Sequence, residues 1–203
     1  VAGPPGGWYI LAVRVLLSND DGVHAPGLKA LAAAFDGDEV WVVAPDREQS
    51  ASSHAISLHR PLRMHELAPR WYAVDGTPTD AVYMGLNLVL RAARPDVVVS
   101  GVNHGPNLGN DVLYSGTVAA AMEAALLGVN AVAISLAAPP PHEFAEAARF
   151  AVALARRVHA NPPPAPLLLN VNVPAGPIRG YRFARLGRRT YGQEVVEKLD
   201  PRG

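Results

Sequence analysis

Short apolar runs alternate along this chain with longer segments in which apolar residues recur every three or four positions. The short runs are rich in valine, leucine and isoleucine, which is typical of strands buried on both faces of a sheet. They lie at residues 13–17, 39–44, 96–100, 131–136 and 167–173. The longer segments predict helices, at residues 26–35, 77–91, 117–127 and 143–160.

This alternation predicts an α/β fold with a mostly parallel sheet and right-handed crossovers. Between the second and third apolar runs, residues 56–66 and 71–74 look like extended pieces of an irregular excursion. The length of 203 residues suits one domain. We expect residues 1–12 to be a flexible extension and residues 13–203 to be that domain.

The polar loops of the chain follow predicted strands. In open α/β sheets, ligands bind outside the carboxyl ends of the strands. Residues 19–21 follow the first strand, residues 46–54 the second, and residues 101–115 the third. One rim of the sheet would then gather polar side chains from all three loops, namely Asp20, Asp21, Ser50, Asn103, Asn107 and Ser115.

Two adjacent carboxylates, Asp20 and Asp21, come directly after the first strand. Neighbouring carboxylates at the end of a buried strand repel each other and resist desolvation, and a bound cation would relieve both costs. Alternatively, the aspartates and Gly22 merely supply the geometry of a strand-to-helix turn. This stretch alone leaves the two interpretations equally open.

The segment 101–117 is unusually long and rich in glycine for a connection. Its glycine spacing does not match the dinucleotide-binding fingerprint, and it has no lysine to make a P-loop. It ends in Ser115, Gly116 and Thr117 at the start of an alanine-rich helix, where free N–H groups and the helix dipole could bind an anion. The alternative is an ordinary serine or threonine cap of that helix.

Composition excludes several classes of function. Acidic and basic residues are equal, at 18 each, and cysteine is absent. The chain therefore has no global basic field for duplex nucleic acid, no disulfides, no thiolate zinc site and no cysteine nucleophile. No apolar run reaches the length of a membrane span, and residues 1–12 read poorly as a signal peptide. We expect a cytoplasmic protein that does not bind membranes.

The oxygen ligands of the rim, without cysteine, favour Mg²⁺ or Mn²⁺ over a structural zinc ion. The seven histidines show no metal-ligand spacing. His24 and His104 lie inside polar loops and could approach a substrate, but we expect neither to be a ligand. The absence of a G-x-S-x-G motif disfavours a serine hydrolase. One oxygen-bound metal beside an anion site indicates phosphoryl chemistry.

Five segments of the chain resemble the survival protein SurE family. They are SNDDGVHAPGLKAL, VVAPDREQSASSHAISL, DGTPTDAV, VVSGVNHGPNLGNDVLYSGTVAAAMEAALLG and NVNVP, and the resemblance runs in order from about residue 13 to residue 203. It implies a Rossmann-like, mostly parallel sheet with helices on both faces, an irregular β excursion and a C-terminal arm. It also implies a homodimer or homotetramer in which that arm is exchanged between subunits.

The family consists of metal-dependent nucleotidases, so the resemblance implies roles for particular residues. It implies one divalent cation per subunit, either Mn²⁺ or Mg²⁺, held by Asp20, Asp21, Ser50 and Asn103. The phosphate contacts would be Asn107, Ser115, Gly116 and Thr117. The choice of Ser50 rests on the resemblance alone, because composition does not distinguish it from Ser52 and Ser53.

The resulting hypothesis is hydrolysis of nucleoside 5′- and 3′-monophosphates by a metal-activated water. Either Asp20 or Asp21 could also accept the proton of that water, and the sequence does not separate a ligand from a base. Members of the family continue for several tens of residues beyond the point where this chain ends, which predicts an incomplete arm. The alternatives are a nucleotide-binding protein with impaired catalysis and a broader phosphatase or exopolyphosphatase. The sequence does not identify the preferred base.

Overall fold

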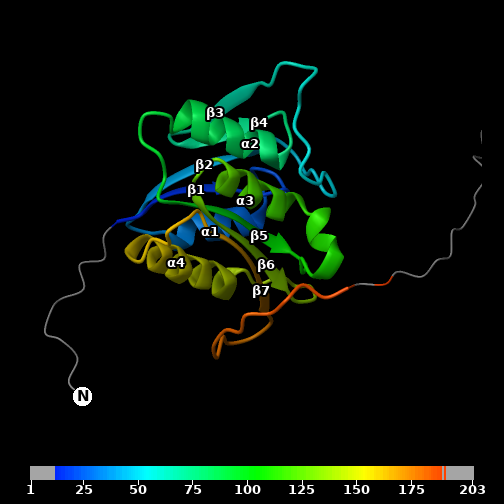
Figure 1. The fold of residues 1–203 in the computed structure, drawn as a ribbon. Helices are drawn as coiled ribbons and strands as arrows, with labels where there is room; N and C mark the ends of the chain where they lie inside the picture. Colours follow the sequence, from blue (N-terminus) through cyan, green and yellow to red (C-terminus); the bar gives the residue numbers. More distant parts are fainter. Residues whose placement is uncertain (1–11, 189, 191–203) are drawn as a thin grey trace, which may run out of the picture.

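The computed structural model describes residues 12–188 and 190. The predicted extension, residues 1–12, lies outside the described residues except for its last position, and so does the end of the predicted arm. Within the described part, the chain forms the predicted α/β fold (Figure 1).

The five predicted apolar runs all form strands of one sheet, and the excursion adds two more. The strands are β1 (Arg14–Ser18), β2 (Glu39–Pro45), β3 (Met64–Ala68), β4 (Trp71–Val74), β5 (Val97–His104), β6 (Asn130–Ala137) and β7 (Leu168–Pro174). Their order across the sheet is β3-β4-β2-β1-β5-β6-β7. All neighbouring pairs are parallel except β3 with β4. Figure 1 shows β3 at the top edge and β7 at the bottom edge.

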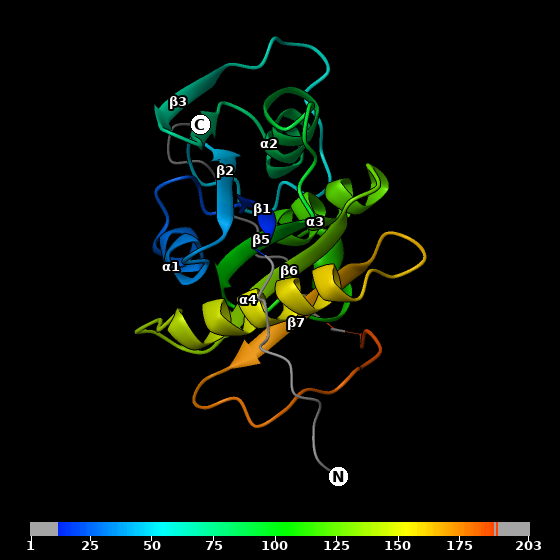
Figure 2. The ribbon, with the colours of Figure 1, turned by 90° about the vertical axis from the view of Figure 1, so that its left-hand side faces the viewer.

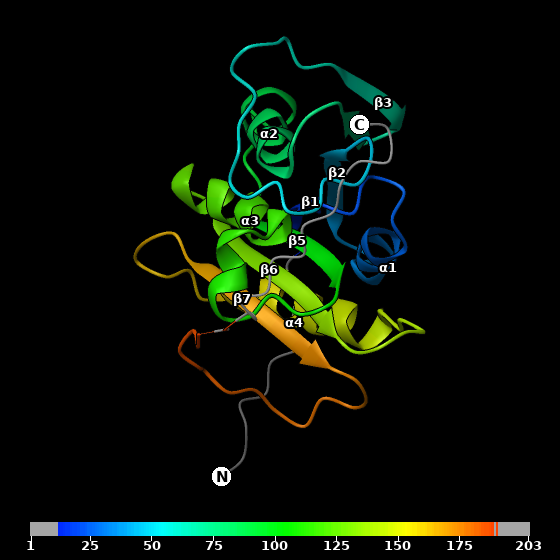
Figure 3. The same cartoon turned by 90° about the vertical axis from the view of Figure 1, so that its right-hand side faces the viewer.

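Helices cover both faces of the sheet, as predicted. One hydrophobic cluster includes α1 (Pro26–Ala34) and α4 (Ala145–Ala160), and a second includes α2 (Pro78–Met84) and α3 (Gly116–Leu126). Figure 2 shows α1 on one side of β2 and α2 on the other, and Figure 3 shows the same arrangement from the opposite direction. The sheet is therefore the middle of three layers.

The valine run of β5 explains how one strand supports both layers. Successive side chains of a strand point to opposite faces of its sheet. Val97 and Val99 accordingly pack in the cluster with α1 and α4, whereas Val98 packs in the cluster with α2 and α3. All three are fully buried. A central strand with two covered faces needs this continuous apolar run rather than an alternating one.

The helix α2 begins with a capping box. Thr77 Oγ1 accepts a hydrogen bond from the N–H of Asp80, and the Asp80 carboxylate accepts one from the N–H of Thr77, at 3.1 and 3.0 Å. The regular helix is shorter than predicted and continues as a π-helical turn, Gly85–Val89. A Cβ atom at residue 85 would lie 2.9 Å from the side chain of Leu16. Close packing on β1 thus requires a glycine here, and glycine weakens a regular helix.

The strand β5 is longer than predicted, because it runs to His104 instead of ending at Ser100. Its pairing with β6 is interrupted between Ser100 and Asn103 and then resumes. Gly101 takes a φ of +138° within this interruption, a conformation that glycine adopts without strain. The rest of the predicted loop contains a 3₁₀ helix, Gly109–Leu113.

The irregular excursion contains less strand than predicted, because residues 56–63 form none. Instead, the N–H and hydroxyl groups of Ser57 donate hydrogen bonds to the Asp80 carboxylate, at 2.9 and 2.8 Å. After β7, residues 175–188 form an arm without helix or strand, and its Tyr181 and Phe183 are exposed. None of the helices in the described part of the chain is both long and apolar enough to cross a membrane.

Candidate active site

A topological switch point lies at β1. The chain passes from β1 to β2 on one side, and β5 later pairs with β1 on the other side. Ligands of doubly wound sheets bind at such a point, outside the carboxyl ends of the strands. A cavity of about 610 Å³ is found there. It is lined by Asp20, Asp21, Ser50, Ala51, Asn103, His104, Asn107, Asp111, Tyr114 and Ser115.

A tight turn presents the two carboxylates at the end of β1. The side-chain amide of Asn19 donates to the carbonyl of Gly22 at 3.0 Å, and Gly22 has a φ of +97°. The N–H of Gln49 donates to the carbonyl of Asp20 at 2.8 Å and so ties the loop after β2 to the turn. Asp and Gly thus do supply turn geometry, as one interpretation of the sequence held, and both carboxylates also line the cavity.

Asp20 is buried against the start of α3. It is 7% exposed, and the hydroxyl of Thr117 donates a hydrogen bond to its Oδ1 atom. A Cβ atom at residue 116 would lie 2.7 Å from Asp20 Cβ, so only the glycine at position 116 allows this approach. Burial raises the pKa of Asp20, and the hydrogen bond from Thr117 opposes that rise.

Asp21 lies beside His104, and both side chains line the cavity. Its Oδ1 atom lies 2.9 Å from Nδ1 of His104, whose side chain is 52% exposed. Burial, followed by the charge of Asp20, raises the pKa of Asp21 to about 6, and His104 opposes that rise. Ionising both carboxylates is therefore unfavourable with the protein's own groups alone, and their negative charge lacks a full counter-charge. A divalent cation would compensate it.

The other two predicted metal ligands differ in exposure. Asn103, at the end of β5, is half-buried and donates from Nδ2 to the carbonyl of Gly105 at 2.8 Å, which leaves Oδ1 as the ligand atom of its amide. Ser50 is exposed, and its hydroxyl donates to Oε1 of Glu48. All four predicted ligands offer oxygen atoms, and such a set fits Mg²⁺ or Mn²⁺.

Two further observations bear on how well these residues fit a divalent cation. The buried Oδ1 atom of Asn19 has no hydrogen-bond partner among the described residues, so polar capacity remains unused beside Asp20. Within residues 12–188 and 190, no group of three or more His, Cys, Asp and Glu side chains could hold a metal ion. A cation at this rim would therefore combine the two carboxylates with neutral oxygen donors.

The predicted phosphate contacts at the start of α3 already have partners in the protein. Ser115 caps the helix, because its Oγ atom accepts a hydrogen bond from the N–H of Val118 at 3.1 Å. The Thr117 hydroxyl is used by Asp20. Ser115 lines the cavity, whereas Gly116 and Thr117 lie behind Asp20. A contact of these three residues with phosphate stays a prediction.

Asn107 is held in place by the two asparagines of β7. Its N–H donates to the side chain of Asn172 at 2.8 Å, and its carbonyl accepts hydrogen bonds from the amides of Asn170 and Asn172, at 2.9 and 3.0 Å. Its own amide donates to Ser135 at 2.8 Å. Asn170 and Asn172 were not among the site residues predicted from the sequence. Their spacing of two places both on one face of a strand, and that signal could have indicated a shared partner.

Four residues that line the cavity were absent from the predicted site, namely Ala51, His104, Asp111 and Tyr114. His104 was noted as a loop histidine and not as a ligand. Its position beside Asp21 depends on the extension of β5, which the apolar pattern did not show. Asp111 and Tyr114 come from the 3₁₀ helix and the residue after it.

Comparison with known proteins gives a consistent result over most of the chain. The family model described as survival protein SurE matches residues 15–193. The protein named 5′-nucleotidase SurE of Anaeromyxobacter sp. (strain K) is 89% identical over 94% of this chain and 75% of its own length. The protein of the same name from Myxococcus xanthus (strain DK1622) is 58% identical over 94% of this chain and 73% of its own length.

A solved structure shows the same fold. The SurE protein from Aquifex aeolicus aligns with a TM-score of 0.84 and 40% sequence identity. The alignment covers 93% of this chain and 78% of that protein. The three layers described above are therefore shared with a protein whose crystal structure is known.

Proposed function

The chain belongs to the survival protein SurE family, and from that premise we propose that it hydrolyses nucleoside 5′- and 3′-monophosphates to nucleoside and phosphate. The 5′ activity is the one that the names of its relatives carry. The observation that supports the proposal best is the pair of adjacent carboxylates at the switch point, of which Asp20 contacts the start of α3. Negative charge in that position suits a cation, and a helix start suits a phosphate.

One divalent cation, Mn²⁺ or Mg²⁺, would be held by Asp20, Asp21, Ser50 and Asn103. When bound, such a cation polarises a phosphoryl oxygen and activates water. The protein supplies the fixed geometry for this chemistry. Thr117 orients Asp20, and the Gly105 carbonyl orients the amide of Asn103.

Phosphate would lie between the cation and the start of α3. The dipole of the first turn would stabilise the negative charge of the phosphoryl oxygens. Asn107 borders the same cavity, and its hydrogen bonds with Ser135 of β6 and Asn172 of β7 hold it there. Positioning of this kind contributes much of the catalysis of phosphoryl transfer.

Phosphate release from AMP tests the proposal. The protein is assayed with Mn²⁺, with EDTA, and with EDTA followed by excess Mn²⁺. We expect turnover with Mn²⁺, loss of turnover with EDTA, and recovery on adding the metal back. Turnover that EDTA does not change would contradict the metal site. A panel containing 3′-AMP and polyphosphate separates a nucleotidase from a broader phosphatase.

The homodimer or homotetramer and the cytoplasmic location predicted from the sequence stay predictions. The exposed aromatic residues of the arm, Tyr181 and Phe183, support contact with another subunit. Sedimentation measurements on the chain would test that prediction directly.

A further inference from the structure

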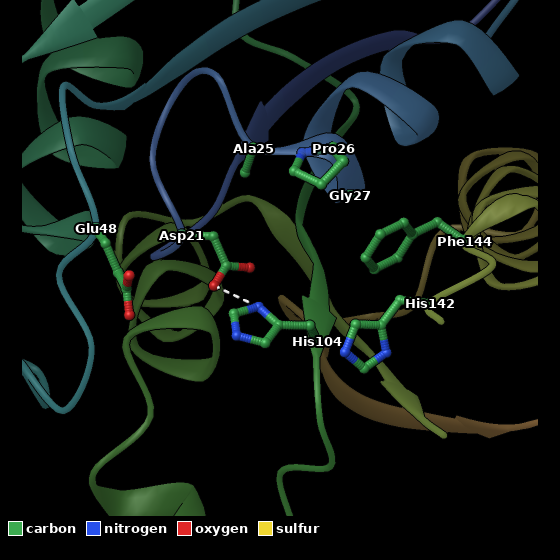
Figure 4. Close-up of a pocket in the computed structure, with 8 residues that line it drawn as sticks. All are labelled: Asp21, Ala25, Pro26, Gly27, Glu48, His104, His142 and Phe144. Atoms are coloured by element: carbon green, nitrogen blue, oxygen red, sulfur yellow. Dashed lines mark ion pairs between the residues drawn. The ribbon is translucent and has the colours of Figure 1, made fainter. Parts of the chain in front are cut away.

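A second hollow adjoins the cavity at the strand ends. It has a volume of about 480 Å³ and shares Asp21 and His104 with the first cavity. The residues that line it are Asp21, Ala25, Pro26, Gly27, Glu48, His104, His142 and Phe144 (Figure 4). Figure 4 shows Asp21 and His104 between Glu48 on one side and the rings of His142 and Phe144 on the other.

Three aromatic rings follow one another along one wall of this second hollow. The ring centres of His104 and His142 are 5.8 Å apart, and those of His142 and Phe144 are 5.9 Å apart. The apolar residues Ala25 and Pro26 form the facing wall. A hollow with one aromatic and one apolar wall suits a flat, uncharged ring system.

The fold holds both walls. A Cβ atom at residue 27 would lie 2.0 Å from the carbonyl oxygen of Val102 and 3.3 Å from Cε1 of Phe144, so Gly27 lets α1 pack tightly against both. Phe144 packs against the core cluster of α1 and α4. The Nδ1 atom of His142 has no hydrogen-bond partner among the described residues, so its ring is positioned by its aromatic neighbours.

The carboxylates of the second hollow suit the polar groups of a base and a ribose. Among the described residues, no lysine or arginine lines this hollow, and its two carboxylates are Asp21 and Glu48. Hydroxyl and amino groups of a ligand could donate hydrogen bonds to them. The described residues that line the first cavity also include carboxylates, namely Asp20, Asp21 and Asp111, and no lysine or arginine, so a phosphate there would depend on the proposed cation and on the start of α3 at Ser115.

We propose that the second hollow binds the base of the nucleotide, stacked on His142 and Phe144, while the phosphate occupies the first cavity. This inference rests on the proposed function, because it assigns the leaving group of the same reaction to a place. The ribose, which joins the base to the phosphate, would lie at Asp21 and His104, because these two residues line both cavities. The hollow thereby distinguishes nucleotides from phosphate esters that lack a base.

Hydrolysis of AMP and of ribose 5-phosphate tests the inference, because ribose 5-phosphate carries a hydroxyl group where AMP carries the base. Replacing an aromatic side chain by alanine removes the part of the binding energy that comes from stacking of a base on it. We therefore expect His142→Ala to lower kcat/KM for AMP about tenfold. For ribose 5-phosphate we expect a change of less than about twofold, because that substrate makes no stacking contact. Phe144→Leu, which keeps apolar volume in the core, should act in the same direction.

His65→Ala is the matched control, because His65 is an exposed histidine of the edge strand β3. We expect it to leave both substrates unchanged. Equal losses for AMP and ribose 5-phosphate in His142→Ala, or no loss for AMP, would overturn the inference. A selective loss for AMP in Tyr114→Ala instead would place the base against Tyr114 in the first cavity and would overturn it as well.

Binding of adenosine, measured by saturation-transfer NMR, separates this inference from the proposed function. Adenosine has no phosphate, so its binding does not depend on hydrolysis. We expect the base protons to show transfer with the unaltered protein and clearly less with His142→Ala. If the protein hydrolysed no nucleotide, the proposed function would be wrong. The NMR measurement would still show whether the second hollow binds a base. Equal transfer in both proteins, or none in the unaltered protein, would reject the site.

Discussion

The cavity at the strand ends has two walls that differ in exposure. The strand-end wall consists of Asp20, Asp21, Asn103 and Ser115, which come from β1, β5 and the start of α3. The loop wall is the segment 46–63, which contributes Ser50. Asp20 and Ser115 are buried, whereas Ser50 is exposed.

The contacts that hold the two walls also differ. The strand-end wall lies on elements that pack in the two hydrophobic clusters, and the carboxylate of Asp20 accepts a buried hydrogen bond from Thr117. The loop wall is tied down by polar contacts, such as the hydrogen bond from Thr77 to the Ala55 carbonyl at 2.7 Å and the His54–Glu123 ion pair at 2.8 Å. The oxygen atoms of the strand-end wall are therefore positioned before any ligand binds, whereas the hydroxyl of Ser50 in the loop wall can still change its position. Substitutions on the strand-end wall should cost more activity.

The largest effect is expected for Asp20→Asn. The amide keeps the size of the side chain and can still accept the hydrogen bond from Thr117, but it removes a charge from the proposed cation site. We expect kcat for AMP to fall about 1000-fold, since a metal ion contributes several kcal/mol to such reactions. Burial raises the pKa of Asp20, so its charge disfavours the folded state, and Tm should stay equal or rise.

Asp36→Asn is the control for that variant, because Asp36 is an exposed carboxylate in the turn after α1. Kinetics with AMP should show an unchanged kcat for this control, and thermal unfolding should show an unchanged Tm. Near-normal turnover in Asp20→Asn would remove Asp20 from the site and, with it, the contrast between the two walls.

Gly116→Ala tests the fixed approach between α3 and β1. The added methyl group would lie 2.7 Å from Asp20 Cβ and 3.0 Å from Pro78, so the helix start or the carboxylate must move. We expect a loss in kcat/KM of about 30- to 100-fold, because small misplacements of a catalytic group are costly. Overpacking should also lower the free energy of unfolding by about 1–3 kcal/mol.

Gly128→Ala separates these two effects. Gly128 has a φ of +86° and open space around it, so alanine is strained there without displacing a neighbour. We expect it to lower stability by about 1 kcal/mol while leaving kcat/KM unchanged. An activity loss of the same size in both glycine variants would mean that stability, rather than the position of Asp20, causes it.

The strand-end wall was also the part of the site that the sequence predicted best. Strands appear as valine-rich runs, and polar residues directly after such a run must lie at the carboxyl edge of a parallel sheet. Asp20, Asp21 and Asn103 were placed at one rim in this way, and the structure brings them to one cavity. The resemblance added their assignment to a metal, which the geometry suits but does not test.

What the sequence did not show depends on contacts between distant segments. The pairing of Thr117 with Asp20 joins residues from two elements, and the apolar pattern carries no information about which hydroxyl meets which carboxylate. The loop wall was the hardest part of the site to predict, because its polar residues make irregular contacts that no sequence periodicity describes. Residues 56–66 were expected to be an extended piece, but residues 56–63 form no strand of the sheet, and Asp80 binds the backbone and hydroxyl of Ser57 instead.

Thr117→Val sharpens the comparison within the strand-end wall. Valine keeps the shape of threonine but cannot donate to Asp20, which leaves a buried carboxylate without this partner. We expect kcat to fall about tenfold and the free energy of unfolding to fall by about 1–3 kcal/mol. Thr117→Ser keeps the hydroxyl and should retain most of the activity in the same kinetic assay. Equal activity in the valine and serine variants would show that the hydrogen bond does not position Asp20.

Ser50→Ala is expected to have the smallest effect, because the loop wall is exposed and can adjust. Ser50 lines the cavity, and its hydroxyl donates to Glu48, whereas the hydroxyl of Ser52 is buried without a partner among the described residues. Losing one neutral oxygen ligand should raise the Mn²⁺ concentration for half-maximal activity about three- to tenfold. Titrating Mn²⁺ into Ser50→Ala and Ser52→Ala measures this. A larger shift for Ser52 would assign the loop ligand to it, and a loss as severe as that of Asp20→Asn would mean that both walls are equally fixed.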